Sequence, residues 1–169
     1  MRIGATLALR ALRVTVRYRT STVTELTRGG CIVTCNHISL LDGIVVALAS
    51  PVPLVFAVDT DFSRRSRRAR FGLAALTWLG LGEVVPIDSS APFGLRTLAR
   101  SLAAGKNVAI FPEGVISLTG ARGPDRPGCQ WLSSQASAAV LELKISGAEQ
   151  SRLFAKAGKL LWPKISLEF

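Results

Sequence analysis

Four short apolar runs, each followed by a segment with helical or turn features, constrain the fold of this 169-residue chain most strongly. The runs cover residues 29–35, 53–58, 82–87 and 107–111. Their length suits buried strands, and strands that alternate with helices form a parallel sheet with helices on its faces. We therefore predict a single α/β domain over residues 1–169, with a largely parallel central sheet flanked by helices.

The segments between these runs carry the helix signals. Residues 40–50 and 64–80 are predicted helices, and the second begins with the basic stretch RRSRRAR. The clearest signals lie in residues 91–104, where leucines line one face. Ser90 can cap this helix and Gly105 suits the left-handed position after it.

The last third of the chain has a weaker pattern. Residues 120–128 read as a loop, residues 138–145 as a strand and residues 148–162 as a helix. Residues 163–169 read as one more strand, and the chain stops inside it. We therefore expect the sequence to be a piece of a longer protein.

The N-terminal segment combines apolar residues with a stripe of arginines. Residues 1–18 fit a helix on which Arg2, Arg10, Arg13 and Arg17 share one narrow face. A basic amphipathic helix over residues 1–20 could lie on an anionic membrane surface. An ordinary domain helix with one solvated face explains the same pattern, and both readings stay open.

The charge balance limits the classes of partner. The net charge is +10, which favours anionic partners: a phospholipid surface, a phosphorylated substrate or nucleic acid. The hydrophobic content of 49% favours the membrane surface over nucleic acid. The longest apolar stretch, residues 40–58, is interrupted by Asp42, Pro51 and Pro53, so it predicts no spanning helix.

Three cysteines give little support to disulfides or to a metal site. Cys31, Cys35 and Cys129 form no even framework, which favours a reducing compartment. Cys31, Cys35 and His37 could in principle hold a metal ion, but a fourth ligand is not evident. We expect no metal.

His37, the single histidine of the chain, precedes Asp42 by five residues. The two side chains can meet only if His37 lies on a turn and Asp42 lies in the first turn of the following helix. Ser39 is then a candidate N-cap, with Asp42 near the capping-box position. Asp42 could orient His37 as a general base, or it could simply cap the helix.

The sequence FPEG (residues 111–114) ends an apolar run. Gly114 lets a ligand approach the main chain, and Glu113 could hold a polar substrate group or orient the loop. A tight turn with an exposed acid is the alternative.

Taken together, NHISLLD followed by AIFPEG resembles the glycerophospholipid acyltransferase family of the 1-acylglycerol-3-phosphate type, whose signature pairs an N-H-x4-D block with an F-P-E-G block. GEVVPID (residues 82–88) is similar to its intermediate block. The order of segments looks most like the acyltransferase part of the bifunctional 2-acylglycerophosphoethanolamine acyltransferase/acyl-carrier-protein synthetases. The resemblance implies the glycerol-3-phosphate acyltransferase-like fold.

The resemblance also implies a mechanism. His37 would take the proton from the free glycerol hydroxyl of a lysophospholipid, and Asp42 would orient His37. That oxygen would attack the thioester of acyl-CoA or acyl carrier protein, without a bound cofactor. The helix start after Ser39 could offer N–H groups to an anion. The expected substrate-binding residues are Asn36, Phe111, Pro112, Glu113 and Gly114.

The same resemblance places the protein peripherally at the cytoplasmic face of the inner membrane, with no nucleic-acid partner. Some positions depart from the family pattern: Val115 and Ile116 stand where many members have arginine. Either another residue, with Arg122 and Arg96 as candidates, binds the acceptor phosphate, or that binding is weak. Residues 123–135 match no recognised part of the family pattern, and residues 138–169 resemble it only loosely. Two alternatives therefore stay open: a catalytically impaired lipid-binding member of the fold, and a basic nucleic-acid-binding domain.

Overall fold

The computed structural model describes residues 3–59, 74, 77, 80–88 and 93–169. Most of the helix predicted over residues 64–80, and the predicted cap Ser90, lie outside the described residues.

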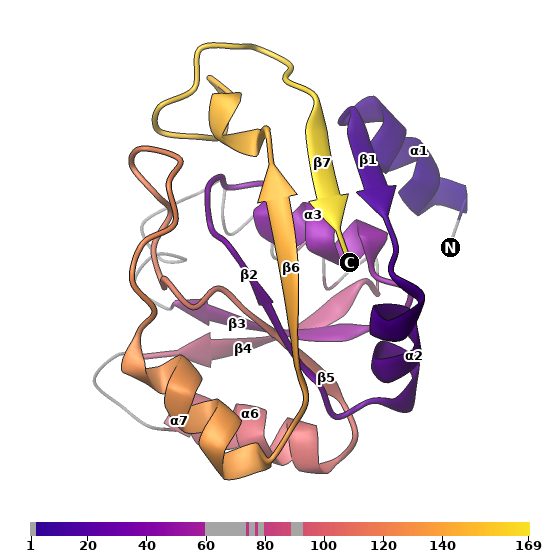
Figure 1. The fold of residues 1–169 in the computed structure, drawn as a ribbon, viewed down its shortest axis with the longest axis vertical. Coiled ribbons are helices and arrows are strands. Elements are labelled where there is room, and N and C mark those ends of the chain that lie inside the picture. The colour runs from indigo at the N-terminus through magenta and orange to yellow at the C-terminus, as the bar shows by residue number, and fades with distance from the viewer. Residues whose placement is uncertain (1–2, 60–73, 75–76, 78–79, 89–92) are drawn as a thin grey trace.

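The described helices and strands alternate along much of the chain (Figure 1). In chain order they are α1 (Ile3–Ala11), β1 (Val14–Arg17), α2 (Thr20–Arg28), β2 (Ile32–Cys35), α3 (Asp42–Ala49), β3 (Leu54–Asp59), β4 (Gly82–Ile87), α6 (Phe93–Ala103), β5 (Asn107–Ile110), α7 (Pro127–Ala136), β6 (Val140–Ser146), the 3-10 turn η1 (Ala148–Gln150) and β7 (Ile165–Glu168). The four predicted strands before residue 112 are confirmed as β2, β3, β4 and β5.

The strands form one seven-stranded sheet in the order β1-β7-β6-β2-β5-β3-β4. The five strands from β6 to β4 run parallel to one another. β7 is antiparallel to β6, and β1 pairs with β7 in parallel. The predicted α/β fold with a largely parallel sheet is therefore confirmed.

Apolar side chains fill both faces of the sheet, as they do where helices cover both sides. Val33 and Phe56 belong to the core cluster that contains α1 and α3. Ile32 and Val55, their neighbours in sequence, point the other way into a second cluster with Leu98 of α6. The alternation of side chains along each strand thus builds two cores around one sheet.

The helix predicted over residues 1–18 is wrong in its second half. α1 ends at Ala11, Arg13 adopts the left-handed conformation with φ 55°, and Val14–Arg17 is an edge strand. The β-branched residues of this strand favour the sheet, and the strand pairs with Ile165–Glu168 at the far end of the chain. Helical periodicity within a short window does not reveal such a distant partner.

The helix predicted over residues 148–162 is also wrong. Only Ala148–Gln150 forms a helical turn, and the chain then folds back on itself. The N–H of Arg152 bonds the carbonyl of Leu160, and the N–H of Leu160 bonds the carbonyl of Gln150. These cross-loop bonds take the place of the helical ones.

Two helices lie where the sequence patterns predict none, α2 and α7. The predicted loop over residues 120–128 ends at Pro127, which occupies the first turn of α7. Proline is common at this position because its missing N–H is not needed there. Of the helices that the structure describes, none has both the length and the apolar character needed to span a bilayer.

Candidate active site

The two sequence blocks meet at one edge of the sheet. β2 and β5 are parallel neighbours, with Thr34 opposite Ile110, so their carboxyl ends lie side by side. His37 follows β2 and Phe111 follows β5, which places both just beyond this edge. Ligand sites in such sheets form outside the carboxyl ends of the strands.

His37 and Asp42 form a hydrogen-bonded pair, as the turn-then-helix prediction requires. The Nδ1 atom of His37 lies 2.9 Å from Oδ2 of Asp42. Asp42 is fully buried, whereas 18% of the His37 side chain is exposed. A carboxylate at Nδ1 fixes the proton on that nitrogen and leaves Nε2 as the acceptor. This arrangement suits a general base.

The carboxylate of Asp42 also organises the turn before α3. Its Oδ2 accepts the N–H groups of Ile38 (2.7 Å) and Ser39 (2.8 Å). Asp42 therefore caps the turn and orients His37 with the same oxygen, so the two alternative readings of this residue describe one geometry.

The prediction of Ser39 as N-cap is wrong, because Leu41 occupies that position. The Ser39 hydroxyl instead accepts the N–H of Leu41 within the turn. The N–H groups of Leu40 and Asp42 bond the carbonyls of Phe154 and Ser39. All five N–H groups from residue 38 to residue 42 thus have acceptors inside the protein, so these groups are not available to an anion as the sequence suggested.

Glu113 joins the two blocks and is 4% exposed. Its Oε1 accepts the N–H of His37 at 2.9 Å, and its Oε2 accepts the N–H of Gly123 at 2.8 Å. Both carboxylate oxygens are therefore used to hold main chain, which agrees with the orienting reading of Glu113 and not with the exposed acid of the alternative.

Phe111 lies against the catalytic candidate. Its ring stacks on the His37 imidazole with centroids 4.4 Å apart and planes 24° apart. The stacked ring covers one face of the imidazole and so limits the orientations that the imidazole can adopt.

Asn36 faces main chain as well. Its amide nitrogen donates to the carbonyl of Ile145 at 2.9 Å, and its oxygen accepts the N–H of Ile145 at 2.8 Å. The residue thereby ties the end of β2 to β6. Both ends of the amide are occupied, so its geometry is that of a structural clamp.

Arg126 is a site residue that the sequence reasoning missed. Its Nε donates to the carbonyl of Glu113 at 3.3 Å, and its side chain crosses the Cα of Gly114. A Cβ on Gly114 would lie 2.5 Å from that Nε, and Gly114 has φ +64°, so glycine is needed here for two reasons. No acid pairs with this guanidinium among the described residues. Arg126 is distant in sequence from FPEG, so no local sequence pattern predicts that the two lie together.

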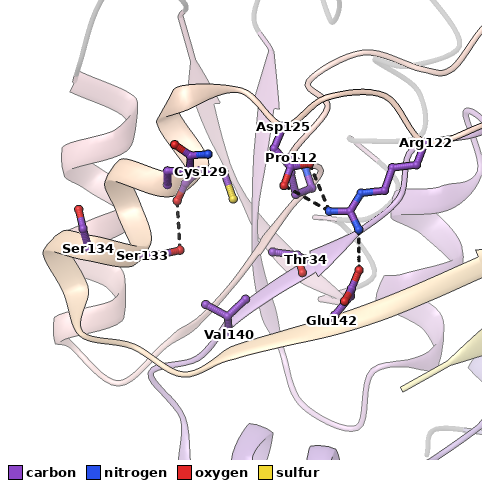
Figure 2. A pocket seen from close by; sticks show the side chains of 10 residues that line it. Thr34, Pro112, Arg122, Asp125, Cys129, Ser133, Ser134, Val140 and Glu142 are labelled. Atoms are coloured by element: carbon purple, nitrogen blue, oxygen red, sulfur yellow. Dashed lines mark hydrogen bonds and ion pairs between the residues drawn. The ribbon is translucent and has the colours of Figure 1, made fainter.

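A groove of about 720 Å³ lies beside Pro112, between α7 and the outer face of β6 (Figure 2). Arg122 supplies the positive charge of its lining. The guanidinium bonds Glu142 at 2.6 Å and Asp125 at 3.2 Å. Arg122 is therefore neutralised by two acids, which argues against the phosphate-binding role considered for it. Arg96, the other arginine considered, lies on the exposed side of α6.

The cysteine thiols point to protein acceptors. The Cys31 thiol lies 3.4 Å from the carbonyl of Glu25, and that of Cys35 lies 3.7 Å from Oδ1 of Asn36. Burial raises the pKa of both thiols. The described residues contain no group of three or more His, Cys, Asp or Glu side chains placed to hold a metal ion.

Two comparisons bear on this site. The sequence profile of the Acyltransferase family matches residues 13–145, which include both blocks and Arg126. The crystal structure of the 1-acyl-sn-glycerophosphate (LPA) acyltransferase PlsC from Thermotoga maritima is similar over 97% of this chain, with a TM-score of 0.64 and 21% sequence identity. The match spans 63% of the PlsC chain. At this identity the likeness establishes a shared fold.

Proposed function

The chain belongs to the Acyltransferase family, and from that premise we propose that it moves a fatty acyl group from a thioester to the free glycerol hydroxyl of a lysophospholipid. The observation that carries the proposal is the contact between Nδ1 of His37 and the buried carboxylate of Asp42. It leaves Nε2 of a partly exposed imidazole as a proton acceptor.

In the proposed reaction, Nε2 of His37 takes the proton of the acceptor hydroxyl as its oxygen attacks the thioester carbon. The buried Asp42 carboxylate stabilises the imidazolium that forms. The tetrahedral intermediate then collapses, the C–S bond breaks, and the imidazolium returns the proton to the departing thiolate. The substrate supplies the nucleophile, so no serine or cysteine of the chain has to attack.

Arg126 is our choice for the residue that binds the phosphate of the acceptor. Its guanidinium stands beside the FPEG turn and donates to the carbonyl of Glu113, and no acid among the described residues pairs with it. The guanidinium of Arg122 is instead engaged by Asp125 and Glu142. Arginine suits phosphate because its planar fork donates two parallel hydrogen bonds. Of the predicted substrate-binding residues, Phe111, Pro112 and Gly114 then shape the acceptor site, while Asn36 and Glu113 hold its frame.

The donor is a thioester of coenzyme A or of an acyl carrier protein, without a bound cofactor. The likeness to the bifunctional 2-acylglycerophosphoethanolamine acyltransferases favours lysophosphatidylethanolamine as the acceptor. We place the protein peripherally on the cytoplasmic face of the inner membrane, where such an acceptor resides. The charge of +10 supports an anionic lipid surface as its partner.

The deciding experiment measures acyl transfer from a labelled thioester to lysophosphatidylethanolamine. Wild type should transfer the label, and His37→Ala should lower the rate by about 10²-fold or more, as loss of a general base does. Arg126→Ala should raise the KM for the acceptor, and Arg122→Ala is the matched control. A folded wild type that binds vesicles but transfers nothing to any lysophospholipid would support the catalytically impaired alternative instead.

A further inference from the structure

The loop of residues 151–164, which we call the C-terminal loop, exposes three consecutive large apolar side chains. Leu160, Leu161 and Trp162 are 51%, 61% and 46% exposed. On α1, Ile3 and Leu7 are 82% and 59% exposed. Single exposed leucines are ordinary, but a contiguous group of this kind marks an interaction surface.

The C-terminal loop is fixed to the end of α1. The indole N–H of Trp162 donates to the carbonyl of Ala11 at 2.8 Å, and the guanidinium of Arg13 donates to the carbonyl of Trp162 at 3.0 Å. Figure 1 shows the loop above the end of the sheet where β2 and β6 finish, with α1 nearby. Two segments from opposite ends of the chain therefore meet at Ala11 and Arg13.

The charge of these segments has a single sign. Residues 1–18 and 151–164 contain no aspartate or glutamate. Their basic residues are Arg2, Arg10, Arg13, Arg17, Arg152, Lys156, Lys159 and Lys164. Most of the net charge of +10 thus lies in the segments that also expose leucine and tryptophan. Apolar residues with tryptophan at the centre and a basic surround complement an anionic bilayer surface.

We infer that the C-terminal loop and the exposed side of α1 dock the protein on an anionic phospholipid bilayer. Leu160, Leu161 and Trp162 enter the headgroup region, and Lys159 and Lys164 contact lipid phosphates. The inference rests on the proposed function in one respect: docking would give the protein access to a lysophospholipid held in the membrane. The sequence predicted a membrane contact through a helix over residues 1–20, but α1 ends at Ala11. The inferred contact is instead centred on the C-terminal loop.

Direct contacts connect this surface to the candidate active site. The N–H of Leu40, inside the His37 block, donates to the carbonyl of Phe154 at 2.8 Å. Leu41 lines the same small apolar cavity as Trp162, and the ammonium of Lys156 reaches the carbonyl of Ile116 beyond FPEG. Docking through this surface therefore brings the imidazole of His37 toward the bilayer that holds a lysophospholipid.

The apolar part is tested by vesicle co-sedimentation. Phosphatidylglycerol vesicles should bind wild type, and the double variant Leu160→Gln/Leu161→Gln should bind at least about tenfold more weakly, since affinity follows buried apolar area. Phe93→Gln is the matched control, because Phe93 is 73% exposed on α6, away from the loop in Figure 1. Equal loss in the two variants, or no loss in either, would overturn the inference.

The charged part has a control of equal net charge. Lys159→Glu/Lys164→Glu should weaken binding to the same vesicles at least about tenfold, because each basic residue near an anionic surface contributes about fivefold in affinity. Arg96→Glu/Arg100→Glu changes the net charge equally, but on the exposed side of α6. If both variants lose binding equally, the attraction is a property of the whole molecule and the docking surface is wrong.

Two further measurements separate docking from catalysis. With a short-chain lysophospholipid below its micelle concentration, the Leu160→Gln/Leu161→Gln variant should transfer acyl groups as wild type does, whereas His37→Ala should bind vesicles without transfer. If wild type ignores vesicles but binds duplex DNA with strong salt dependence, the surface serves nucleic acid and the inference fails. Self-association of wild type that Leu160→Gln/Leu161→Gln abolishes would assign the surface to a second copy instead.

Discussion

The side-chain carboxylate of Glu113 accepts the main-chain N–H of His37 at 2.9 Å, so the second sequence block holds the first in place. The other carboxylate oxygen holds the N–H of Gly123 in the loop before α7. One buried acid thus links the ends of β2 and β5 to the loop that carries Arg126. Glu113 therefore helps to position the imidazole of His37 through the His37 main chain, without a hydrogen bond to the ring itself.

Glu113→Gln should therefore damage both stability and activity. An amide has one oxygen for two N–H donors, so one buried N–H loses its acceptor, at about 1–3 kcal/mol. We expect a lower unfolding free energy in urea and a lower kcat. Glu142→Gln is the control, because its side chain is 68% exposed and its salt bridge is a surface one. An unchanged midpoint and rate for Glu113→Gln would contradict the bridging role.

Gly29→Ala and Gly105→Ala form a matched pair for stability. Both glycines follow a helix and have positive φ, +84° and +78°, so alanine is strained at either. Gly29 also has ψ 174°, in a backbone region that is essentially confined to glycine. At Gly29 the new Cβ would also lie 2.3 Å from the carbonyl oxygen of Gly105, whereas at Gly105 nothing lies within 4 Å. Thermal unfolding should show the larger loss for Gly29→Ala. Equal losses of stability in the two variants would mean that the main chain around Gly29 shifts to accommodate the new Cβ at no net cost in free energy.

The sequence predicts the local part of the site well. His37 and Asp42 are five residues apart, so the turn and the helix start between them decide whether they meet, and both can be read from local patterns. The central strands β2, β3 and β5 are likewise predicted by short apolar runs, because they place apolar side chains in the cores on both faces of the sheet.

The parts that the sequence does not predict depend on distant pairing. Val14–Arg17 has a helical pattern within its own window and becomes a strand only beside Ile165–Glu168. Arg126 reaches Gly114 because Gly123 is held by Glu113, and no local period encodes that turn. The prediction of Ser39 as the N-cap is also wrong. Ser39 is a residue type that often caps helices, but the carboxylate of Asp42 accepts the N–H groups of Ile38 and Ser39 and sets the turn before α3.

The cysteines should differ in their reaction with an alkylating reagent. Burial raises the pKa of all three thiols, so at pH 8 each holds less of the reactive thiolate than it would in an unfolded chain. Cys129 is partly exposed, whereas Cys31 and Cys35 are buried. Mass spectrometry should find slow modification at Cys129 that quickens as pH rises, with the other two modified only in denaturant. Prompt modification of Cys35 in the folded protein would contradict the burial described above.

Substitutions of Asp42 should separate its charge from its hydrogen bonds. In Asp42→Asn the amide oxygen can still accept the three N–H groups of His37, Ile38 and Ser39. The imidazole then keeps its orientation but loses the negative charge that stabilises the imidazolium, and we expect kcat to fall about 10²-fold.

Asp42→Ala removes orientation and charge together, so its kcat should fall further than that of Asp42→Asn. The loss should come with reduced stability of about 1–3 kcal/mol, because buried N–H groups are left without an acceptor. In a His37→Ala background, neither Asp42 substitution should lower the residual rate further, because residues that act as one unit are not additive. An additional loss there, measured with the same labelled thioester, would show that Asp42 acts on the reaction by a route other than His37.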